Sequence, residues 1–358
     1  MFYIIALLQN NISFFTNRLK KTSALISMIV IVYLLRGTDS RTTPDYNVYQ
    51  SQYTANSDYF ESGYNFLTHI ANNFGLPYQE FRLLFATFGA LIFFMAVNRH
   101  TKHPEFAIFC YMVAALPADL VQIRQFIMIS FTILGYSFFK KSNFASFVMG
   151  EIFVFLGTQF HSLGWIFVLL APLIFVKANL LRKLLGISIV LFTIFTAAFY
   201  VIPSQYLLAF TSKIIVLLSS RSDIGQNVAN VYSNSAGLFV IAIMFSLSMI
   251  AAILLYRVQV KESMSFSIKA LHIVIFVMLI SVLLAYMSID YVRLLRSAFV
   301  FYFVLLSNLV TAENKRRLYS YMLLMSLLML YLQVGVVYQT NGRLLPYILH
   351  FKNQNIIQ

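Results

Sequence analysis

The chain has 358 residues, of which 60% are hydrophobic and only 11% are charged, and its formal net charge is +14. A soluble domain carries about 25% charged residues, so this composition excludes a soluble globular protein and indicates many membrane spans. The basic residues cluster at the ends of apolar segments and not on a soluble surface, so the positive charge predicts no nucleic-acid partner.

Apolar stretches follow one another along almost the whole chain, and about twelve approach the length of about 20 residues that a span needs. They cover residues 2–15, 22–35, 83–97, 106–120, 126–139, 144–157, 163–176, 184–202, 236–256, 270–288, 298–310 and 319–337. The first is the weakest because Gln9, Asn10 and Asn11 interrupt it. The sequence therefore predicts an all-α, polytopic integral membrane protein with about 12 transmembrane helices, in which residues 1–358 form a single membrane domain.

Lys and Arg residues gather in every second loop between these stretches. Six loops each hold two or more of them, namely Arg18, Lys20 and Lys21; Arg99 and Lys102; Lys140 and Lys141; Lys177, Arg182 and Lys183; Arg257, Lys261 and Lys269; and Lys315, Arg316 and Arg317. Cytoplasmic loops carry an excess of Lys and Arg, so these six loops are predicted to face the cytoplasm. Both termini then face outward if the first stretch spans the membrane.

The first long loop on the outer, extracytoplasmic side covers residues 37–81. Tyr46, Tyr49 and Tyr53 follow one another in this loop at intervals of three and four residues. That spacing predicts a helix on which the three aromatic rings share one face.

The second long extracytoplasmic loop covers residues 203–235. It contains an apolar segment, 206–218, which Lys213 interrupts. We expect this segment to form an interfacial helix, lying in the plane of the membrane surface or dipping partway into it.

A second set of basic residues faces outward in this topology, against the usual bias. It consists mainly of arginine: Arg36, Arg41, Arg82, Arg124, Arg221, Arg293, Arg296 and Arg343, with Lys213 and Lys352. The planar guanidinium group binds phosphate through paired hydrogen bonds, so this set predicts an anionic ligand at the outer face.

Each outward arginine also has a purely structural interpretation. Arg293 and Arg296 are three residues apart and share a helical face, where they could pair with Asp290 and with lipid headgroups. Arg124 could pair with Asp119, which precedes it by five residues. Both interpretations stay open at the level of the sequence.

Nucleotide, dinucleotide and zinc motifs are absent from the sequence. It contains no Walker loop, no dinucleotide-binding glycine fingerprint and no zinc-ligand cluster. The sequence therefore predicts neither a cofactor nor a metal, and it argues against an ATP-driven pump.

Five short motifs lie in or next to the outer loops. They are Arg36-Gly37-Thr38-Asp39, Asp45-Tyr46-Asn47-Val48-Tyr49, Glu61-Ser62-Gly63-Tyr64, Ile123-Arg124-Gln125 and Phe160-His161. Their order and placement resemble the EpsG-type branch of the Wzy-like bacterial polysaccharide polymerases, over roughly residues 20–180.

The resemblance implies a GT-C-like fold and a glycosyltransferase of the bacterial cytoplasmic (inner) membrane. Such proteins transfer a growing glycan from undecaprenyl diphosphate to a sugar hydroxyl of a new lipid-linked repeat unit at the outer face. The implied partners are this lipid-linked donor and acceptor, the lipid bilayer, a chain-length regulator and a flippase.

The motifs also assign roles to individual residues. His161 is the expected base for the hydroxyl proton, with Asp39 as its rival. The diphosphate is assigned to Arg124, Arg293, Arg296 and Arg36, and the glycan to Asp45, Tyr46, Tyr49, Glu61 and Tyr64. Structural alternatives are an ordinary interfacial histidine, a turn-capping aspartate and an aromatic belt at the membrane surface.

Two rival functions remain. A flippase for lipid-linked oligosaccharides would need charge along a path through the membrane, and Glu151 is the main charged residue inside a predicted span. Glu151 could equally be a protonated packing residue. A ligase that uses the same donor and a different acceptor, as O-antigen ligases do, is not excluded by the sequence.

Overall fold

The protein is described by a computed structural model that covers residues 1–43, 45–141, 143–199, 236–259, 266–337 and 341–350. Every regular element in these ranges is helical, so the all-α class is confirmed. The amino-terminal helices are α1 (Phe2–Thr16), α2 (Lys20–Arg36), α3 (Tyr46–Thr54), α4 (Ser62–Asn73), α5 (Tyr78–His100), α6 (Pro104–Ala114), α7 (Leu116–Asp119), α8 (Ile123–Phe138) and α9 (Phe144–Thr158).

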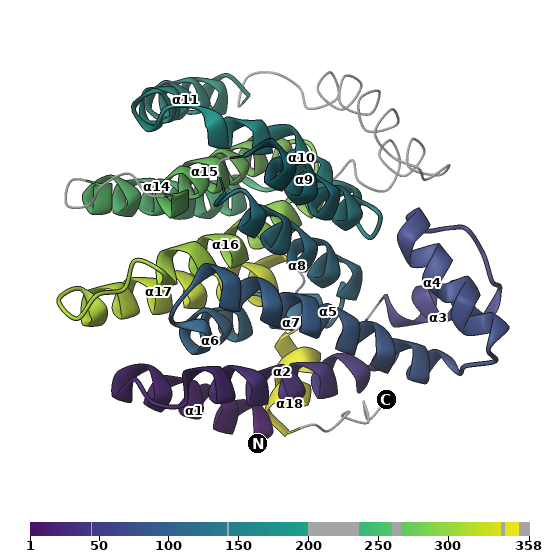
Figure 1. Cartoon of the computed structure of the whole chain (residues 1–358). Coiled ribbons are helices and arrows are strands. Elements are labelled where there is room, and N and C mark those ends of the chain that lie inside the picture. The colour runs from purple at the N-terminus through teal and green to yellow at the C-terminus, as the bar shows by residue number, and fades with distance from the viewer. Residues whose placement is uncertain (44, 142, 200–235, 260–265, 338–340, 351–358) are drawn as a thin grey trace.

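The second half of the chain continues this helical bundle. Its elements are η1 (Ser162–Gly164), α10 (Trp165–Leu170), η2 (Ala171–Phe175), α11 (Ala178–Phe199), α14 (Leu238–Gln259), α15 (Phe266–Ala285), η3 (Ile289–Tyr291), α16 (Val292–Ser307), α17 (Lys315–Leu330), η4 (Tyr331–Val337) and α18 (Asn341–His350). Figure 1 shows the long helices stacked side by side, with α1 and α2 at one edge of the bundle and α11 at the other.

Each of the predicted apolar stretches is mostly helical where the structure describes it. Five helical segments among the described residues are long and apolar enough to cross a membrane: Tyr78–His100, Ala178–Phe195, Leu238–Arg257, Phe266–Ala285 and Lys315–Val337. Shorter apolar helices include α1, α6, α8 and α9. The membrane class is therefore supported by length and composition, whereas the number of about 12 spans stays a prediction.

Proline explains one of the shorter helices. The stretch predicted over 106–120 is divided into α6 and α7 at Ala115, two residues before Pro117. Proline lacks an amide hydrogen and its ring clashes with the preceding helical turn, so a continuous helix is disfavoured there. The turn that results is fully buried and brings Asp119 and Gln122 into the interior of the bundle.

Close packing holds the bundle together. Nearly all side chains of α15 and α16 are buried, and these two helices form its centre. On the other side, α8 and α9 approach so closely that a Cβ atom at Gly135 would lie 2.6 Å from the carbonyl oxygen of Gly150. Small residues allow such close backbone contact between membrane helices, where hydrophobic exclusion gives little driving force.

Basic loops meet at one end of the bundle. Lys315 Nζ donates to a carbonyl oxygen near the end of α1 at 3.3 Å, and Lys269 Nζ donates to one near the end of η2 at 3.3 Å. Lys140 Nζ donates to a carbonyl oxygen at the end of α5. Loops that are distant in sequence and carry the predicted cytoplasmic charges thus lie together, as the positive-inside pattern requires.

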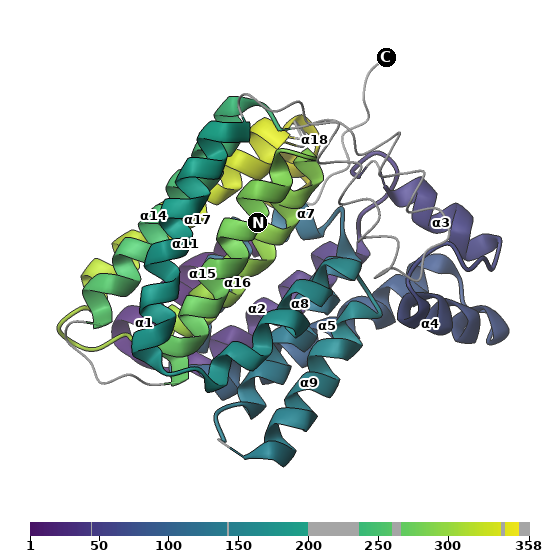
Figure 2. The same cartoon turned by 90° about the horizontal axis from the view of Figure 1, so that it is seen from above.

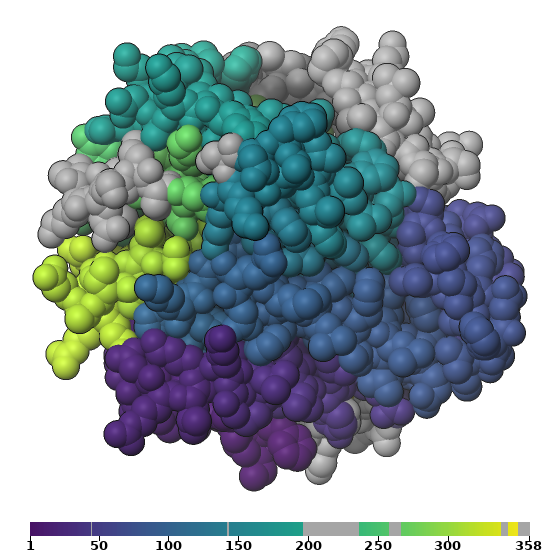
Figure 3. All heavy atoms as spheres, viewed as in Figure 1, coloured from purple at the N-terminus to yellow at the C-terminus, as the bar shows by residue number. Residues whose placement is uncertain are grey.

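The opposite end carries the first long loop. Its helices α3 and α4 lie beyond the ends of the bundle helices in both ribbon views and form a lobe at the edge of the space-filling view (Figures 1, 2 and 3). Helix α18 is at the same end, because Tyr347 Oη donates to the carbonyl oxygen of Leu34 in the last turn of α2 at 2.7 Å. The second long loop, 203–235, lies outside the described residues, as does its expected interfacial helix.

Cysteine labelling tests which end faces outward. Ser51 on α3 and Ala312 between α16 and α17 are exposed at opposite ends, whereas the single natural cysteine, Cys110, is buried. In a Cys110→Ala background, a membrane-impermeant thiol reagent should label Ser51→Cys in intact cells. Ala312→Cys should react only after the membrane is opened, because its loop belongs to the basic end. The reverse pattern would invert the topology.

Candidate functional site

Arg124 lies in the first turn of α8 inside a cage built by the first long loop. Its guanidinium group forms an ion pair with Glu61, and its Nε donates to Tyr49 Oη at 3.1 Å. The guanidinium carbon lies 4.1 Å from the ring centre of Phe60 and 5.7 Å from that of Tyr64. A cation held by a carboxylate and aromatic faces is stabilised although Arg124 is only 7% exposed.

Glu61 joins this cage to the turn between α9 and η1. Its Oε1 accepts a hydrogen bond from the backbone amide of Ser162 at 3.2 Å. The amide of Gly63 donates to the carbonyl oxygen of Gln159 at 2.9 Å. A Cβ atom at Gly63 would lie 2.8 Å from that oxygen, so only glycine allows the contact. The start of α4 is therefore fixed against the turn that holds His161.

His161 is oriented by its own backbone. It precedes η1, and its Nδ1 accepts a hydrogen bond from the amide of Leu163 at 3.3 Å. With Nδ1 acting as acceptor, the neutral ring carries its proton on Nε2. His161 is half-buried, next to the Ser162 amide that Glu61 binds.

Arg296 has a second, fully buried carboxylate partner. It forms an ion pair of 3.1 Å with Asp119, and both side chains are almost completely excluded from solvent. It also donates to Gln125 Oε1 at 2.6 Å, to Gln122 Oε1 at 2.8 Å and to Gln333 Oε1 at 3.1 Å. These contacts connect α16 with the α7–α8 turn and with η4.

Arg293 is the more accessible arginine of α16. It pairs with Asp290 at 2.5 Å, and the two side chains are 22% and 29% exposed. Its carbonyl oxygen accepts a hydrogen bond from the side-chain amide of Gln125, so α8 and α16 meet at this point. Three of the arginine–carboxylate pairs at this end of the bundle involve the first turns of α8 and α16: Arg124–Glu61, Arg293–Asp290 and Arg296–Asp119.

Asp45 comes close to these pairs at the start of α3. Burial raises the pKa of its carboxyl group above the usual value, and the charge of Asp290 adds to this effect, while Arg293 and Arg124 oppose it. The carboxylate of Asp45 thus interacts electrostatically with both Arg293 and Arg124. Asp45 is the acidic residue of the first loop that is electrostatically coupled to two of the predicted diphosphate ligands.

Asp39 has a different environment, which matches the turn-capping alternative. Its Oδ1 accepts hydrogen bonds from the amides of Arg41 at 2.9 Å and Thr42 at 3.1 Å, and its Oδ2 pairs with the Arg41 side chain at 2.9 Å. Partial burial raises the pKa of Asp39, but the hydrogen bonds from Thr42 and Arg41 and the charge of Arg41 outweigh it, so the pKa falls below its usual value.

Arg36 and Arg82 lie at the ends of α2 and α5. Arg36 is exposed and faces Glu80 at 3.8 Å. Arg82 is buried, and its guanidinium group donates to the carbonyl oxygen of Leu35 at 2.8 Å and to Tyr78 Oη at 3.2 Å. These contacts join α5 to α2. They lie at the ends of α2 and α5, whereas the ion pairs of Arg124, Arg293 and Arg296 involve α8 and α16.

The tyrosines of the first loop pack inward. Tyr46, Tyr49 and Tyr53 share the buried face of α3, which confirms the predicted helical face. Tyr49 and Tyr64 lie edge to face with ring centres 5.9 Å apart, and Tyr46 packs in the same way on Tyr78 at 5.4 Å. Their rings are buried against other protein side chains on this surface.

Metal ligands do not gather in the part of the chain that the structure describes, where no group of three or more His, Cys, Asp or Glu side chains could hold an ion. Arginine, carboxylate, histidine and aromatic groups do gather at this end of the bundle. Such a set suits an anionic, sugar-bearing ligand.

The model of the EpsG family matches residues 23–349. The chain belongs to the EpsG family. The match extends well beyond the five amino-terminal motifs and includes Arg293 and Arg296 on α16. No curated protein and no solved structure matches the chain significantly. Membership of the EpsG family indicates a polymerase of polysaccharide biosynthesis.

The pairing of the arginines could not be read from the EpsG-family sequence. Arg124 pairs with Glu61 and not with Asp119, and Asp119 pairs with Arg296. Of the glutamines that bind Arg296, Gln125 belongs to the Ile123-Arg124-Gln125 motif and Gln122 directly precedes it, but the sequence does not connect either of them, or Gln333, with Arg296. Their meaning depends on contacts between helices that are distant in sequence.

Replacing Arg296 should damage folding more than replacing Arg293. Arg296→Gln leaves Asp119 buried and unpaired, which should cost about 3–5 kcal/mol of stability. Arg293→Gln breaks a partly exposed pair and should cost about 1 kcal/mol or less. Melting temperatures of the purified variants in detergent measure the difference. Equal melting temperatures would show that Arg296 is not the buried centre of this network.

Proposed function

We propose that this EpsG-family protein transfers a growing glycan from undecaprenyl diphosphate to a sugar hydroxyl of a new lipid-linked repeat unit at the outer face of the membrane. The observation that carries the proposal is the set of three arginine–carboxylate pairs at the end of the bundle opposite the basic loops. Each pair holds a guanidinium group in place before an anion arrives, which lowers the cost of binding.

Among the arginines, we assign the direct diphosphate contact to Arg293. It is partly exposed, whereas Arg124 and Arg296 are buried. A diphosphate can replace Asp290 as its partner without leaving a buried charge unpaired. Arg124 and Arg296, each neutralised by its carboxylate, hold the surrounding elements around the diphosphate. Exposed Arg36 is a proposed contact for the diphosphate of the second substrate.

The proposed reaction needs a leaving group, a nucleophile and a proton acceptor. The acceptor hydroxyl oxygen attacks the anomeric carbon of the donor sugar, and the bond from that carbon to the diphosphate oxygen breaks. The electron pair goes to the diphosphate, where Arg293 stabilises the developing charge. The hydroxyl proton goes to a protein base.

Asp45 is the carboxylate that suits this base role better than Asp39. Its pKa is raised, so its carboxylate binds a proton more readily, and it is coupled to Arg293 and Arg124. The pKa of Asp39 is lowered and its oxygens already cap a turn. His161, with its proton on Nε2, is proposed to donate a hydrogen bond to the departing diphosphate.

The sugars are proposed to lie beside the first long loop, because the residues assigned to the glycan belong to that loop. Four of these residues, Glu61, Tyr46, Tyr49 and Tyr64, are buried, so we propose that they give this surface its shape while Asp45 contacts the glycan directly.

A ligase would share every step up to the choice of acceptor, and the glycans that a deletion strain accumulates distinguish the two. Single repeats at the outer face indicate a polymerase.

Arg293→Lys should lose most polymer formation. Lysine keeps the charge but not the planar fork, so the diphosphate loses paired contacts that strengthen as it departs, at a cost on the order of 10²–10³ in rate. The measurement is polymer made from lipid-linked repeats by membranes with equal protein levels. Arg343→Lys is the matched control, since Arg343 is exposed on α18. Near-normal polymer from Arg293→Lys would defeat the assignment.

Asp45→Asn should slow transfer by roughly 10²–10⁴ while leaving donor binding intact. The base must be deprotonated, so activity of the unmodified protein should fall as the pH drops through the raised pKa of Asp45, above the usual value of about 3.9. The residual activity of Asp45→Asn should lack this acid limb. Asp39→Asn should keep both the loss of activity at low pH and most of the transfer rate. If instead Asp39→Asn loses both and Asp45→Asn keeps them, the base is Asp39.

A further inference from the structure

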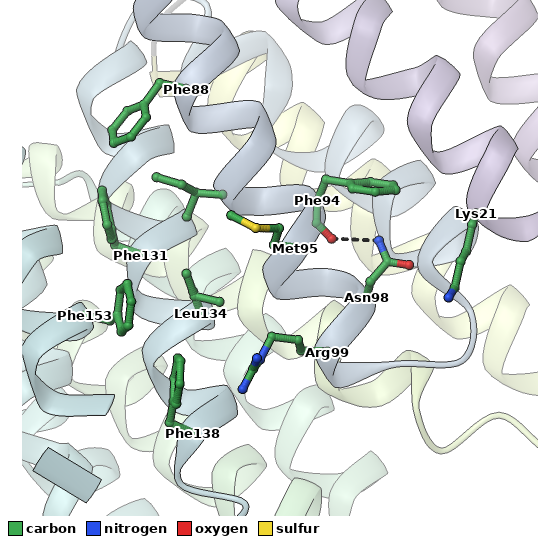
Figure 4. Close-up of a pocket in the computed structure, with 11 residues that line it drawn as sticks. Lys21, Phe88, Phe94, Met95, Asn98, Arg99, Phe131, Leu134, Phe138 and Phe153 are labelled. Carbon is green, nitrogen blue, oxygen red and sulfur yellow. Dashed lines mark hydrogen bonds between the residues drawn. The ribbon is translucent and has the colours of Figure 1, made fainter. Parts of the chain in front are cut away.

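A groove of about 820 Å³ lies along α5, between α2 on one side and α8 and α9 on the other. Aromatic and aliphatic side chains line most of its length, as Figure 4 shows for Phe88, Phe131 and Phe153. It extends along α5 from Phe88 to Arg99, which corresponds to roughly 16 Å of helix. Phe88 is 40% exposed, so the groove opens sideways on the surface of the bundle.

Positive charge is confined to one end of this groove. Lys21 from α2 and Arg99 from α5 both line it there, in the half of the bundle where the basic loops meet (Figure 4). The Arg99 guanidinium carbon lies 4.4 Å from the ring centre of Phe138, and its Nε donates to Ser137 Oγ at 2.7 Å. Stacking and this hydrogen bond fix the guanidinium plane, and no hydrogen bond to its two Nη groups is found among the described residues.

These cations have no carboxylate partner in the part of the chain that the structure describes. Within the described ranges, no carboxylate lies within ion-pair distance of Lys21, Arg99 or the neighbouring Lys140. Burial and the charge of Arg99 together lower the pKa of Lys140, so the positive groups here repel one another. An anion at this end of the groove would relieve that repulsion.

We propose that this groove binds an anionic phospholipid of the leaflet that meets the basic end. Its acyl chains lie on the aromatic wall and its phosphate lies between Lys21 and Arg99. The distribution of charge favours this occupant over the tail of a polyprenyl carrier. The hydrocarbon tail of such a carrier is uncharged, so it would gain no electrostatic stabilisation from Lys21 and Arg99. The site is separate from the proposed reaction and does not depend on it.

Native mass spectrometry in an uncharged detergent tests the site with two lipids, phosphatidylglycerol and phosphatidylcholine. The unmodified protein should retain phosphatidylglycerol over phosphatidylcholine by about tenfold or more, because only phosphatidylglycerol has a net negative charge, whereas Lys21 and Arg99 repel the choline cation beside the phosphate of phosphatidylcholine. The variant Lys21→Gln/Arg99→Gln should lose most of this preference. Arg316→Gln/Arg317→Gln removes the same charge from the exposed start of α17 and should keep it.

A second variant tests the apolar wall without changing charge. Met95 lines the groove and is 49% exposed, so Met95→Trp should fold, narrow the groove and reduce retention of phosphatidylglycerol. Equal retention of both lipids by the unmodified protein would overturn the proposal, as would equal loss in the two double variants. Displacement of phosphatidylglycerol by equimolar decaprenyl phosphate would also overturn it and assign the groove to the carrier lipid.

Discussion

A guanidinium group taken out of water needs fixed hydrogen-bond acceptors, and this requirement organises the end of the bundle that carries the first long loop. Arg124 and Arg296 are buried there, and leaving either without a carboxylate would cost several kcal/mol. Their partners come from other parts of the chain: Glu61 from the first long loop and Asp119 from the α6–α8 turn. Each pair therefore fixes the position of one element against another.

The same pairs divide the arginines into two kinds. Buried Arg124 and Arg296 are surrounded by protein acceptors, and they connect the first long loop, the α7–α8 turn, α16 and η4. Partly exposed Arg293 has Asp290 as its carboxylate partner and lies within the electrostatic reach of Asp45. In the proposed function, the departing diphosphate meets Arg293 inside a frame that Arg124 and Arg296 hold in place, which is the fixed arrangement that electrostatic stabilisation requires.

The sequence predicts the helices and their buried faces better than it predicts the ion pairs between residues that are distant in the chain. Apolar length predicted the helices, and the spacing of Tyr46, Tyr49 and Tyr53 predicted their common buried face, because both depend on neighbours along the chain. The pairing of Arg124 with Glu61, and of Asp119 with Arg296, was not predictable from the sequence, because it depends on which helix ends meet in the folded bundle. The division of the 106–120 stretch at Ala115 could have been predicted from Pro117, two residues later.

Hydrogen exchange over α4 tests most directly whether the Arg124–Glu61 pair holds the first long loop in place. The amides of Gly63 and Tyr64 donate to Gln159 only while α4 is docked. Arg124→Gln and Glu61→Gln should each speed exchange across residues 62–73 by about tenfold or more, and the double variant should add little because the pair acts as a unit. Unchanged protection in both single variants, with normal exchange in the rest of the bundle, would contradict the account.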